Sequence, residues 1–180
     1  MSDVLIGPVE KASIVLADYD SRWPDIFASH AAILSRALGK KALSIEHAGS
    51  TSVTGLAAKP IIDVILVVED SSDEQAYLPA LEAADYVLRV REPDWYQHRM
   101  LRTSQRDVHV HVFSRGCVEI ARMLVLRDRL RASPEDRQLY EATKRALAKE
   151  DWPDMNAYAR AKTAVIEQII SRGRACGPEK

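Results

Sequence analysis

EHAGSTSVTGLAAKPIID, residues 46–63, is the most informative stretch of this 180-residue chain. Small and hydroxyl residues crowd between Gly49 and Gly55, which predicts a tight loop. Backbone N–H groups and hydroxyls gathered in such a loop bind anions, most often phosphate. The apolar run 61–68 follows, and it predicts a buried strand that holds one carboxylate, Asp63. Because an isolated carboxylate is costly to bury, Asp63 must be paired or must bind a ligand.

Hydrophobic spacing outside this stretch predicts a mixed α/β (α+β) fold. We expect further strands over residues 13–17, 43–48, 86–91, 97–103 and 108–113. A helix is expected to begin near Pro24 and to end at Gly39. Ser72 is followed three residues later by Gln75, and this pair predicts a capped helix start.

The last third of the chain is predicted to be helical from Val118 onward. Helix starts are expected at 133–136 and 151–154, and a helix end is expected at Gly173. No linker or internal repeat divides the sequence. Residues 1–180 are therefore predicted to form one domain, a mixed sheet with flanking helices and a C-terminal helical extension.

Bulk composition describes an ordinary globular chain, 47% hydrophobic and 28% charged. A net charge of −1 gives no reason to expect general nucleic-acid binding. The spacing of Cys117 and Cys176 indicates neither a disulfide framework nor a pair of metal ligands. No apolar run is long enough to span a membrane, so a cytoplasmic protein without a membrane partner is expected. The oligomeric state is left open.

Three runs of the sequence carry a family resemblance. They are EHAGSTSVTGLAAKPIIDVILVV at 46–68, LVLRDRLRASPEDRQLYEATKRALA at 124–148 and AYARAKTAVIEQII at 157–170. Together they resemble the GrpB family, which is similar to a branch of the nucleotidyltransferase superfamily with the polymerase-beta-type fold. That superfamily places an acidic residue in a strand about a dozen residues after a Gly-Ser turn. Here twelve residues separate Ser50 from Asp63.

Asp63 is the first candidate for chemistry that the resemblance implies. A metal-dependent nucleotidyltransferase places a second carboxylate two residues further along the strand, where it helps to hold the metal. This chain has Ile65 at that position. Asp63 remains a candidate ligand for Mg²⁺ or Mn²⁺, or a general base. The alternative is a structural carboxylate paired with Lys59 or an arginine.

Histidines offer further candidate groups. Asp107, His109 and His111 alternate with valines, so they share one face of a strand. His111 matches the histidine of the family's strand and could complete a site with Asp63 as a catalytic group or metal ligand. A solvated hairpin face is the alternative. His47 matches the family's histidine before the loop and is a third catalytic candidate, or a packed structural histidine. In a regular strand the side chain of Glu46 faces the side of the sheet opposite to that of His47.

Phosphate-binding candidates come from the loop and from basic side chains. The loop supplies Gly49, Ser50, Thr51 and Ser52, and the resemblance adds Lys59, Arg127, Arg131 and Lys144. Arginine and lysine neutralise phosphate oxygens, and arginine does so with two parallel hydrogen bonds. The alternatives are a tight turn that satisfies its own hydroxyls and a helix with solvated, paired charges.

These observations favour a nucleotidyltransferase-like protein. It would bind a nucleotide or another phosphorylated small molecule at the Gly49–Gly55 loop and transfer a nucleotidyl or phosphoryl group to a small acceptor. Two alternatives stay open: a non-catalytic nucleotide- or CoA-related binding module, and ATP-dependent ligation on the same scaffold. The enzyme hypothesis is weakened by Ile65.

Overall fold

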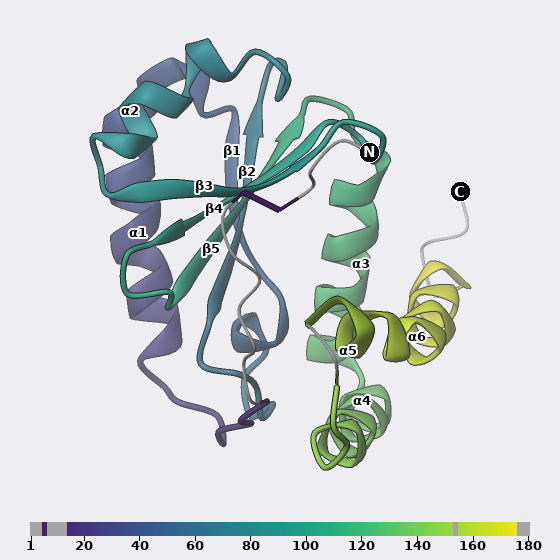
Figure 1. The fold of residues 1–180 in the computed structure, drawn as a ribbon. Helices are drawn as coiled ribbons and strands as arrows, with labels where there is room; N and C mark the ends of the chain where they lie inside the picture. Colours follow the sequence, from purple (N-terminus) through teal and green to yellow (C-terminus); the bar gives the residue numbers. More distant parts are fainter. Residues whose placement is uncertain (1–4, 7–13, 153–154, 176–180) are drawn as a thin grey trace.

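A single mixed sheet organises the computed structural model, which describes residues 5–6, 14–152 and 155–175. Its strands lie in the order β1-β2-β5-β4-β3 (Figure 1). Their bounds are Ser44–Ala48 (β1), Ile62–Val68 (β2), Tyr86–Glu92 (β3), His98–Thr103 (β4) and Val108–Ser114 (β5). Only the central pair β2 and β5 runs parallel, and the other neighbours are antiparallel.

Helices cover both faces of the sheet (Figure 1). On one side lie α1 (Trp23–Leu38) and the short α2 (Leu78–Glu82), and on the other lies α3 (Val118–Ala132). Beyond α3 come α4 (Pro134–Leu147), α5 (Met155–Ala161) and α6 (Thr163–Ala175). The 3₁₀ turns are η1 (Gly39–Lys41), η2 (Ser50–Ser52) and η3 (Glu74–Ala76). The mixed α/β architecture with flanking helices and a helical extension is thus confirmed.

Strand β2 is buried on both faces, which explains its unbroken apolar sequence. Val64 and Leu66 belong to the core cluster under α1 and α2. Ile65 and Val67 belong to the cluster that packs against α3. Asp63 has the same parity as Ile65, so it projects from the α3 face at the end of the strand.

A third apolar cluster ties the Gly-Ser loop to the C-terminal helices. Val53 and Leu56, which follow the loop, are buried against Leu130, Tyr140 and Ile169. Through this cluster the helical extension holds the loop in place over the sheet.

Several sequence predictions hold and others do not. The strands after residue 43 are confirmed within one or two residues, and Gly39 ends α1 with a φ of +54°. Ser133 caps α4, since its Oγ accepts the Asp136 N–H at 3.2 Å. The expected strand over 13–17 is wrong: among the described residues it reduces to one bridge, Ala17 to Ala58.

Two helix-boundary predictions are also wrong. Ser72 caps no helix, because its hydroxyl donates to Asp70 and α2 begins only at Leu78. Gly173 does not end a helix, because α6 continues to Ala175. The helix start predicted at 151–154 falls partly on residues 153–154, outside the described residues, and α5 begins at Met155.

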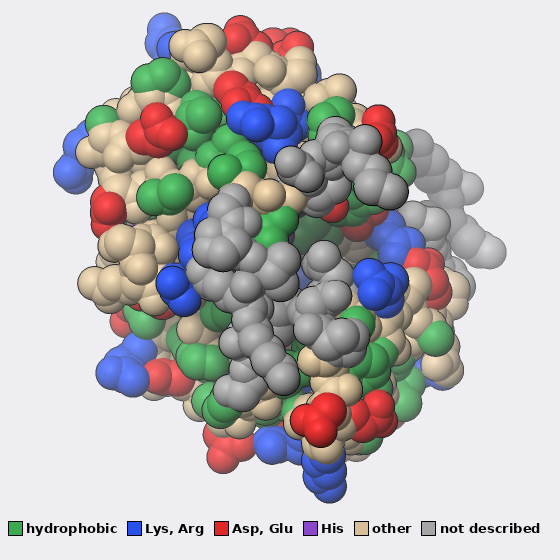
Figure 2. Space-filling view, in the orientation of Figure 1, with side chains coloured by type: hydrophobic (Ala, Val, Ile, Leu, Met, Phe, Trp, Pro, Cys, Tyr) green, Lys and Arg blue, Asp and Glu red, His purple; other side chains and the backbone are tan. Residues whose placement is uncertain are grey.

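The surface carries charges of both signs. Figure 2 shows Lys and Arg side chains interspersed with Asp and Glu over the visible face, without a broad area of one sign. Among the described residues, none of the helices has the length and apolar character needed to cross a membrane.

Candidate functional site

The Gly-Ser loop lies directly on the carboxylate of Asp63. Antiparallel pairing of β1 with β2 places Ala48 opposite Asp63, and the chain turns into η2 at the next residue. Gly49 has a φ of +66°, a backbone conformation that is strained for a residue with a side chain. A methyl group there would collide with Oδ2 of Asp63 and lie 3.1 Å from its Cβ. Only glycine lets the loop approach the carboxylate this closely.

Two histidines of β5 converge on Asp63. The parallel register pairs Asp63 with His109 and Ile65 with His111, so both imidazoles lie on the carboxylate's face. Nε2 of His111 is 3.4 Å from Oδ1 of Asp63, and Nδ1 of His109 is 3.8 Å from the same oxygen. The three side chains keep 23–30% of their surface exposed. They are therefore accessible to a small ligand or ion.

Burial and neighbouring charges shift the acid–base behaviour of this cluster. Burial alone would raise the pKa of Asp63, but the hydrogen bond and charge of His111, with His109 and Lys59, hold this pKa below its usual value. Burial lowers the pKa of His109 to about 4, against the opposing pull of Asp63. At neutral pH Asp63 is thus a carboxylate and His109 is a neutral imidazole.

A cavity of about 400 Å³ opens in front of this cluster. The Gly-Ser loop forms one part of its wall, and three lysines form another. Its lining includes Gly49, Ser50, Thr51, Lys59, Asp63, His109, His111, Lys144, Tyr158 and Lys162. A glycine-hydroxyl loop, cationic groups and a carboxylate cluster therefore face one shared space.

The lysines come from three separate parts of the chain. Lys59 precedes β2, Lys144 lies on α4, and Lys162 lies between α5 and α6. Lys144 is only 2% exposed, and its Nζ donates to Oγ of Ser50 at 3.0 Å and to the Ala57 carbonyl. Nζ of Lys162 lies 4.6 Å from the ring centre of Tyr158.

Burial lowers the pKa of each lysine. For Lys144, desolvation and the nearby Lys162 charge bring it to about 7. For Lys162, desolvation and the Lys59 charge bring it to about 8, although Asp63 opposes the shift. The pKa of Lys59 is lowered by burial in the same way. Crowded, poorly solvated ammonium groups are stabilised by an anion.

Four sequence-predicted residues do not line this cavity: His47, Arg127, Arg131 and Ser52. His47 lies on the opposite sheet face, where it stacks on Phe27 with ring centres 4.6 Å apart. Nη1 of Arg127 donates to Glu46 at 2.8 Å, and Arg131 donates twice to the Ser52 carbonyl. These cations support β1 and the loop from outside the cavity wall.

The hydroxyl groups of the loop residues differ in whether they can contact a ligand in the cavity. Ser52 is buried and donates to the Gly49 carbonyl at 2.6 Å, so its hydroxyl holds the loop together. Thr51 lines the cavity, but its hydroxyl lies 3.1 Å from Nε2 of His47 and 3.3 Å from the Ile61 carbonyl. Ser50 has its hydroxyl on Lys144. Within η2, the Ser52 N–H donates to the Gly49 carbonyl at 3.3 Å.

Lys162 and Tyr158 line the cavity, although neither was predicted from the sequence as a site residue. Both lie in the run AYARAK, the third run that carries the family resemblance, and that was their only signal. Asp107, predicted to share a face with the histidines, instead accepts a 2.6 Å hydrogen bond from Thr103 at the end of β4.

Comparison with known proteins supports the family resemblance that the loop sequence indicates. A family model described as GrpB protein matches residues 13–172. The chain belongs to the GrpB family. The match spans the sheet, the loop and most of the helical extension, so the family resemblance read from the three runs is confirmed.

Relatives of this GrpB-family chain cover most of its length. A UPF0157 protein of Halalkalibacterium halodurans is 48% identical over 177 residues, 97% of this chain and 91% of that one. A UPF0157 protein of Streptomyces coelicolor is 50% identical over 171 residues, 95% and 90% of the two chains. The crystal structure of conserved protein GrpB from Enterococcus faecalis has a TM-score of 0.78 at 31% identity, covering 88% and 96%.

More distant likenesses are weaker. A dephospho-CoA kinase of Mycolicibacterium paratuberculosis is 28% identical over 182 residues, which cover 86% of this chain and 44% of that protein. The Cid1 poly(U) polymerase has a TM-score of 0.47 at 10% identity, covering 80% of this chain and 50% of that one.

Proposed function

We propose that this protein binds a nucleotide or another phosphorylated small molecule in the cavity beside Asp63, and that it transfers a nucleotidyl or phosphoryl group to a small acceptor. One observation carries the proposal. The Gly49 loop and three lysines face the same space as Asp63, although they come from distant parts of the chain. Such a convergence is costly to build unless a ligand uses it.

The charge balance of the cavity favours an anion. Three ammonium groups accompany a single carboxylate among the lining residues. Burial already lowers the pKa of Lys144 to about 7, so the site holds its positive charge poorly on its own. A phosphate placed against Lys144 and Ser50 would satisfy that charge and the hydroxyl together.

Group transfer needs positioning more than covalent chemistry from the protein. Phosphoryl transfer is catalysed mainly by holding the reactants in line and by neutralising the charge on the phosphate oxygens. The carboxylate of Asp63 can accept the hydrogen bond of an acceptor hydroxyl. Lys162 and Lys59 are placed to neutralise charge that develops on the transferred group.

The protein groups around Asp63 do not match a magnesium site. Mg²⁺ prefers oxygen ligands, whereas this cluster offers one carboxylate and two imidazoles. The position of a second carboxylate is held by Ile65, which is fully buried against the α3 cluster.

The same burial of Ile65 favours a second candidate function, a binding module without catalysis. A nucleotide would occupy the cavity in the same way, but no group would be transferred. The shared segment with a dephospho-CoA kinase is compatible with such an accessory role. Both candidate functions predict nucleotide binding, so only a measurement of turnover distinguishes them.

Thermal stability with a panel of ligands tests the proposal. ATP, ADP, CoA and inorganic phosphate are added to the wild type, to Lys162→Met and to Lys40→Met, which replaces an exposed lysine in η1, just after α1. A ligand that binds only the folded protein raises the melting temperature. We expect a shift with at least one phosphorylated compound that Lys162→Met reduces and Lys40→Met keeps. No shift with any compound, or an equal shift in Lys162→Met, would contradict the proposal.

A further inference from the structure

A row of hydrogen-bonded side chains runs from the end of β3 into the candidate site. Nδ1 of His98 lies 2.7 Å from Oε2 of Glu92, and Nε2 of His98 lies 3.0 Å from Nδ1 of His111. Nε2 of His111 then faces Oδ1 of Asp63 at 3.4 Å. Glu92 and His98 do not line the cavity, so the proposed ligand site leaves them without a role.

Donor and acceptor roles along this row follow from its first member. An ionised carboxylate only accepts hydrogen bonds, so the proton on His98 is on Nδ1, toward Glu92. A neutral His98 then has a lone pair on Nε2, and it accepts the Nδ1 proton of His111. The remaining nitrogen of His111, Nε2, points at the carboxylate of Asp63 and holds either a proton that it donates to this carboxylate or a metal ion in place of that proton.

The spacing of these atoms fits a metal ion in place of that proton. Ligands about 2 Å from a tetrahedral ion lie about 3.3 Å apart, close to the 3.4 Å between His111 and Asp63. His109 brings a third ligand atom, and the three ligand atoms lie within 4.8 Å of one another.

We infer that Asp63, His109 and His111 form a site for a transition-metal ion of the zinc, iron or cobalt class, and that Glu92 and His98 fix His111 in the tautomer that binds it. Two imidazoles and one carboxylate suit these ions better than Mg²⁺. Metal-bound histidines are commonly oriented by a hydrogen bond from their other nitrogen, as His98 provides here. Glu92 and His98 are positioning residues.

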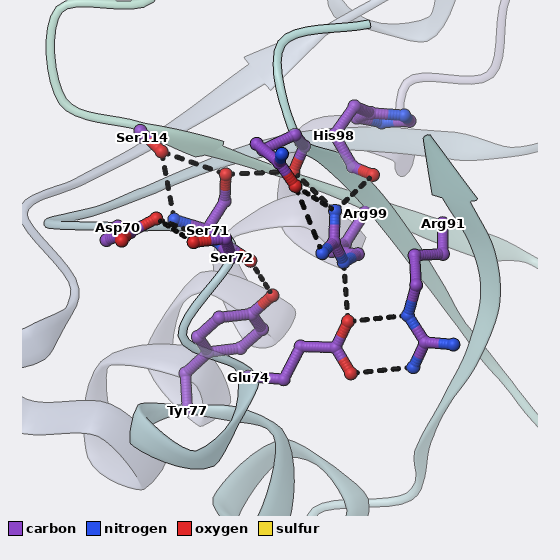
Figure 3. A network of polar contacts seen from close by, with 10 residues as sticks. Asp70, Ser71, Ser72, Glu74, Tyr77, Arg91, His98, Arg99 and Ser114 are labelled. Atoms are coloured by element: carbon purple, nitrogen blue, oxygen red, sulfur yellow. Dashed lines mark hydrogen bonds and ion pairs between the residues drawn. The ribbon is translucent and has the colours of Figure 1, made fainter. Parts of the chain in front are cut away.

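The surrounding structure holds His98 rigidly enough for this role. Its side chain is 5% exposed and stacks between His111 and Phe113, with ring centres 5.2 Å and 4.8 Å away. Hydrogen bonds also hold the backbone at His98 and at the residue before it (Figure 3). Arg99 donates to the carbonyls of Gln97 and His98 at 2.8 Å and 3.2 Å.

Residues of the loop after β2 add further hydrogen bonds to this backbone and to Arg99. Ser71 donates to the Gln97 carbonyl at 2.9 Å, and Glu74 receives Arg99 at 2.6 Å (Figure 3). Gln97 has a φ of +53°, an unfavourable conformation that these contacts maintain. These contacts of the β3–β4 turn fix the position of His98 beside His111.

The inferred ion occupies the cavity of the proposed function, and its binding is measured without any nucleotide. Apo protein is titrated with Zn²⁺, Co²⁺ and Mg²⁺ by calorimetry, and Co²⁺ is also followed by its visible absorption. We expect Zn²⁺ and Co²⁺ to bind at one site, Mg²⁺ to bind far more weakly, and Asp63→Asn to abolish the site. His98→Phe, which keeps a flat ring, is expected to weaken Zn²⁺ binding about 10- to 100-fold.

His30→Phe is the matched control. His30 contacts Tyr86 on the opposite face of the sheet and is expected to leave Zn²⁺ affinity unchanged when substituted. If His98→Phe does not fold, Glu92→Gln and the imidazole ¹⁵N shifts of the Zn²⁺-loaded wild type replace it, with His98 and His111 both expected to be protonated on Nδ1. Unchanged Zn²⁺ affinity in the His98 and Glu92 variants, equal affinity for Mg²⁺, or a His111 that stays protonated on Nε2 when Zn²⁺ is added would overturn the inference. Failure of nucleotide binding alone would leave it standing.

Discussion

Nζ of Lys144 lies 3.0 Å from Oγ of Ser50, although 94 positions separate the two residues in the chain. This contact joins helix α4 to the Gly-Ser loop inside the candidate cavity. A lysine that is 2% exposed with no carboxylate within salt-bridge distance among the described residues is unusual, because its desolvation favours the neutral form. The proposed phosphate explains why this ammonium is held there.

Lys144→Met should weaken binding of a phosphorylated ligand. A hydrogen bond to a charged group is worth about 1.5–3 kcal/mol, which corresponds to about 10- to 150-fold in affinity. Calorimetry at pH 6.5 measures the effect, with Lys40→Met as the exposed control. Equal affinity in the Lys144 variant and the control would show that Lys144 only supports the loop.

The pH dependence of that binding follows from the same lysine. Burial lowers the pKa of Lys144 to about 7, so its charge is present below that pH and is lost as the pH rises. Anion affinity in the wild type should therefore fall between about pH 7 and pH 9. Lys162, with a pKa of about 8, adds to this loss, so Lys144→Met should flatten the profile only in part. A wild-type affinity that stays constant over this interval would contradict the assignment.

Gly49→Ala should be strongly destabilising. The positive φ costs an alanine about 1–2 kcal/mol, and the added methyl group also collides with Asp63. Gly116→Ala is the matched control, because Gly116 has a φ of +78° and open space around its Cβ position. Urea unfolding should show a clearly larger loss for Gly49→Ala. Equal losses in both variants would mean that the loop can move off the carboxylate at no cost.

Glu74 should make stability depend on acid pH. Hydrogen bonds from Arg91 and Arg99, against the opposing effect of burial, lower the pKa of Glu74 from 4.5 to about 2. The lowered pKa stabilises the fold above pH 4.5, and this contribution is lost as the pH falls toward 2. The stability gap between wild type and Glu74→Gln should thus shrink between pH 4.5 and 2.

Urea titrations at pH 7, 4 and 3 measure this gap. Glu69→Gln is the control, since Glu69 forms an exposed pair with Arg115. Exposed pairs contribute little, so that variant should match the wild type at each pH. A Glu74→Gln gap that is constant from pH 7 to pH 3 would rule out the ion pairs as its cause.

Local patterns in the sequence predicted most of the elements for clear reasons. Alternating and continuous apolar runs identified the strands from 43 onward, because each strand buries one or both faces. Ser133 followed by Pro134 predicted a helix start that the cap confirms. The 13–17 prediction failed because a short apolar run carries no information about whether a neighbouring strand is available to pair with it.

The site was only partly predictable, because it depends on strand register and long-range packing. Asp63 and His111 could be paired once β5 was assumed to lie beside β2. Which side of β1 faces Asp63 could not be read from the sequence: Glu46 lies on that side and His47 lies opposite. Lys162 reaches the cavity only through the packing of α5 and α6, and the Glu92–His98 row depends on the β3–β4 turn.

A crystal structure of the protein soaked with a nucleoside triphosphate would show directly whether the cavity binds phosphate. We expect phosphate oxygens within hydrogen-bond distance of Ser50 and of at least one of Lys144 and Lys162, beside Asp63. A nucleotide bound elsewhere on the molecule, with the cavity filled only by water, would contradict it.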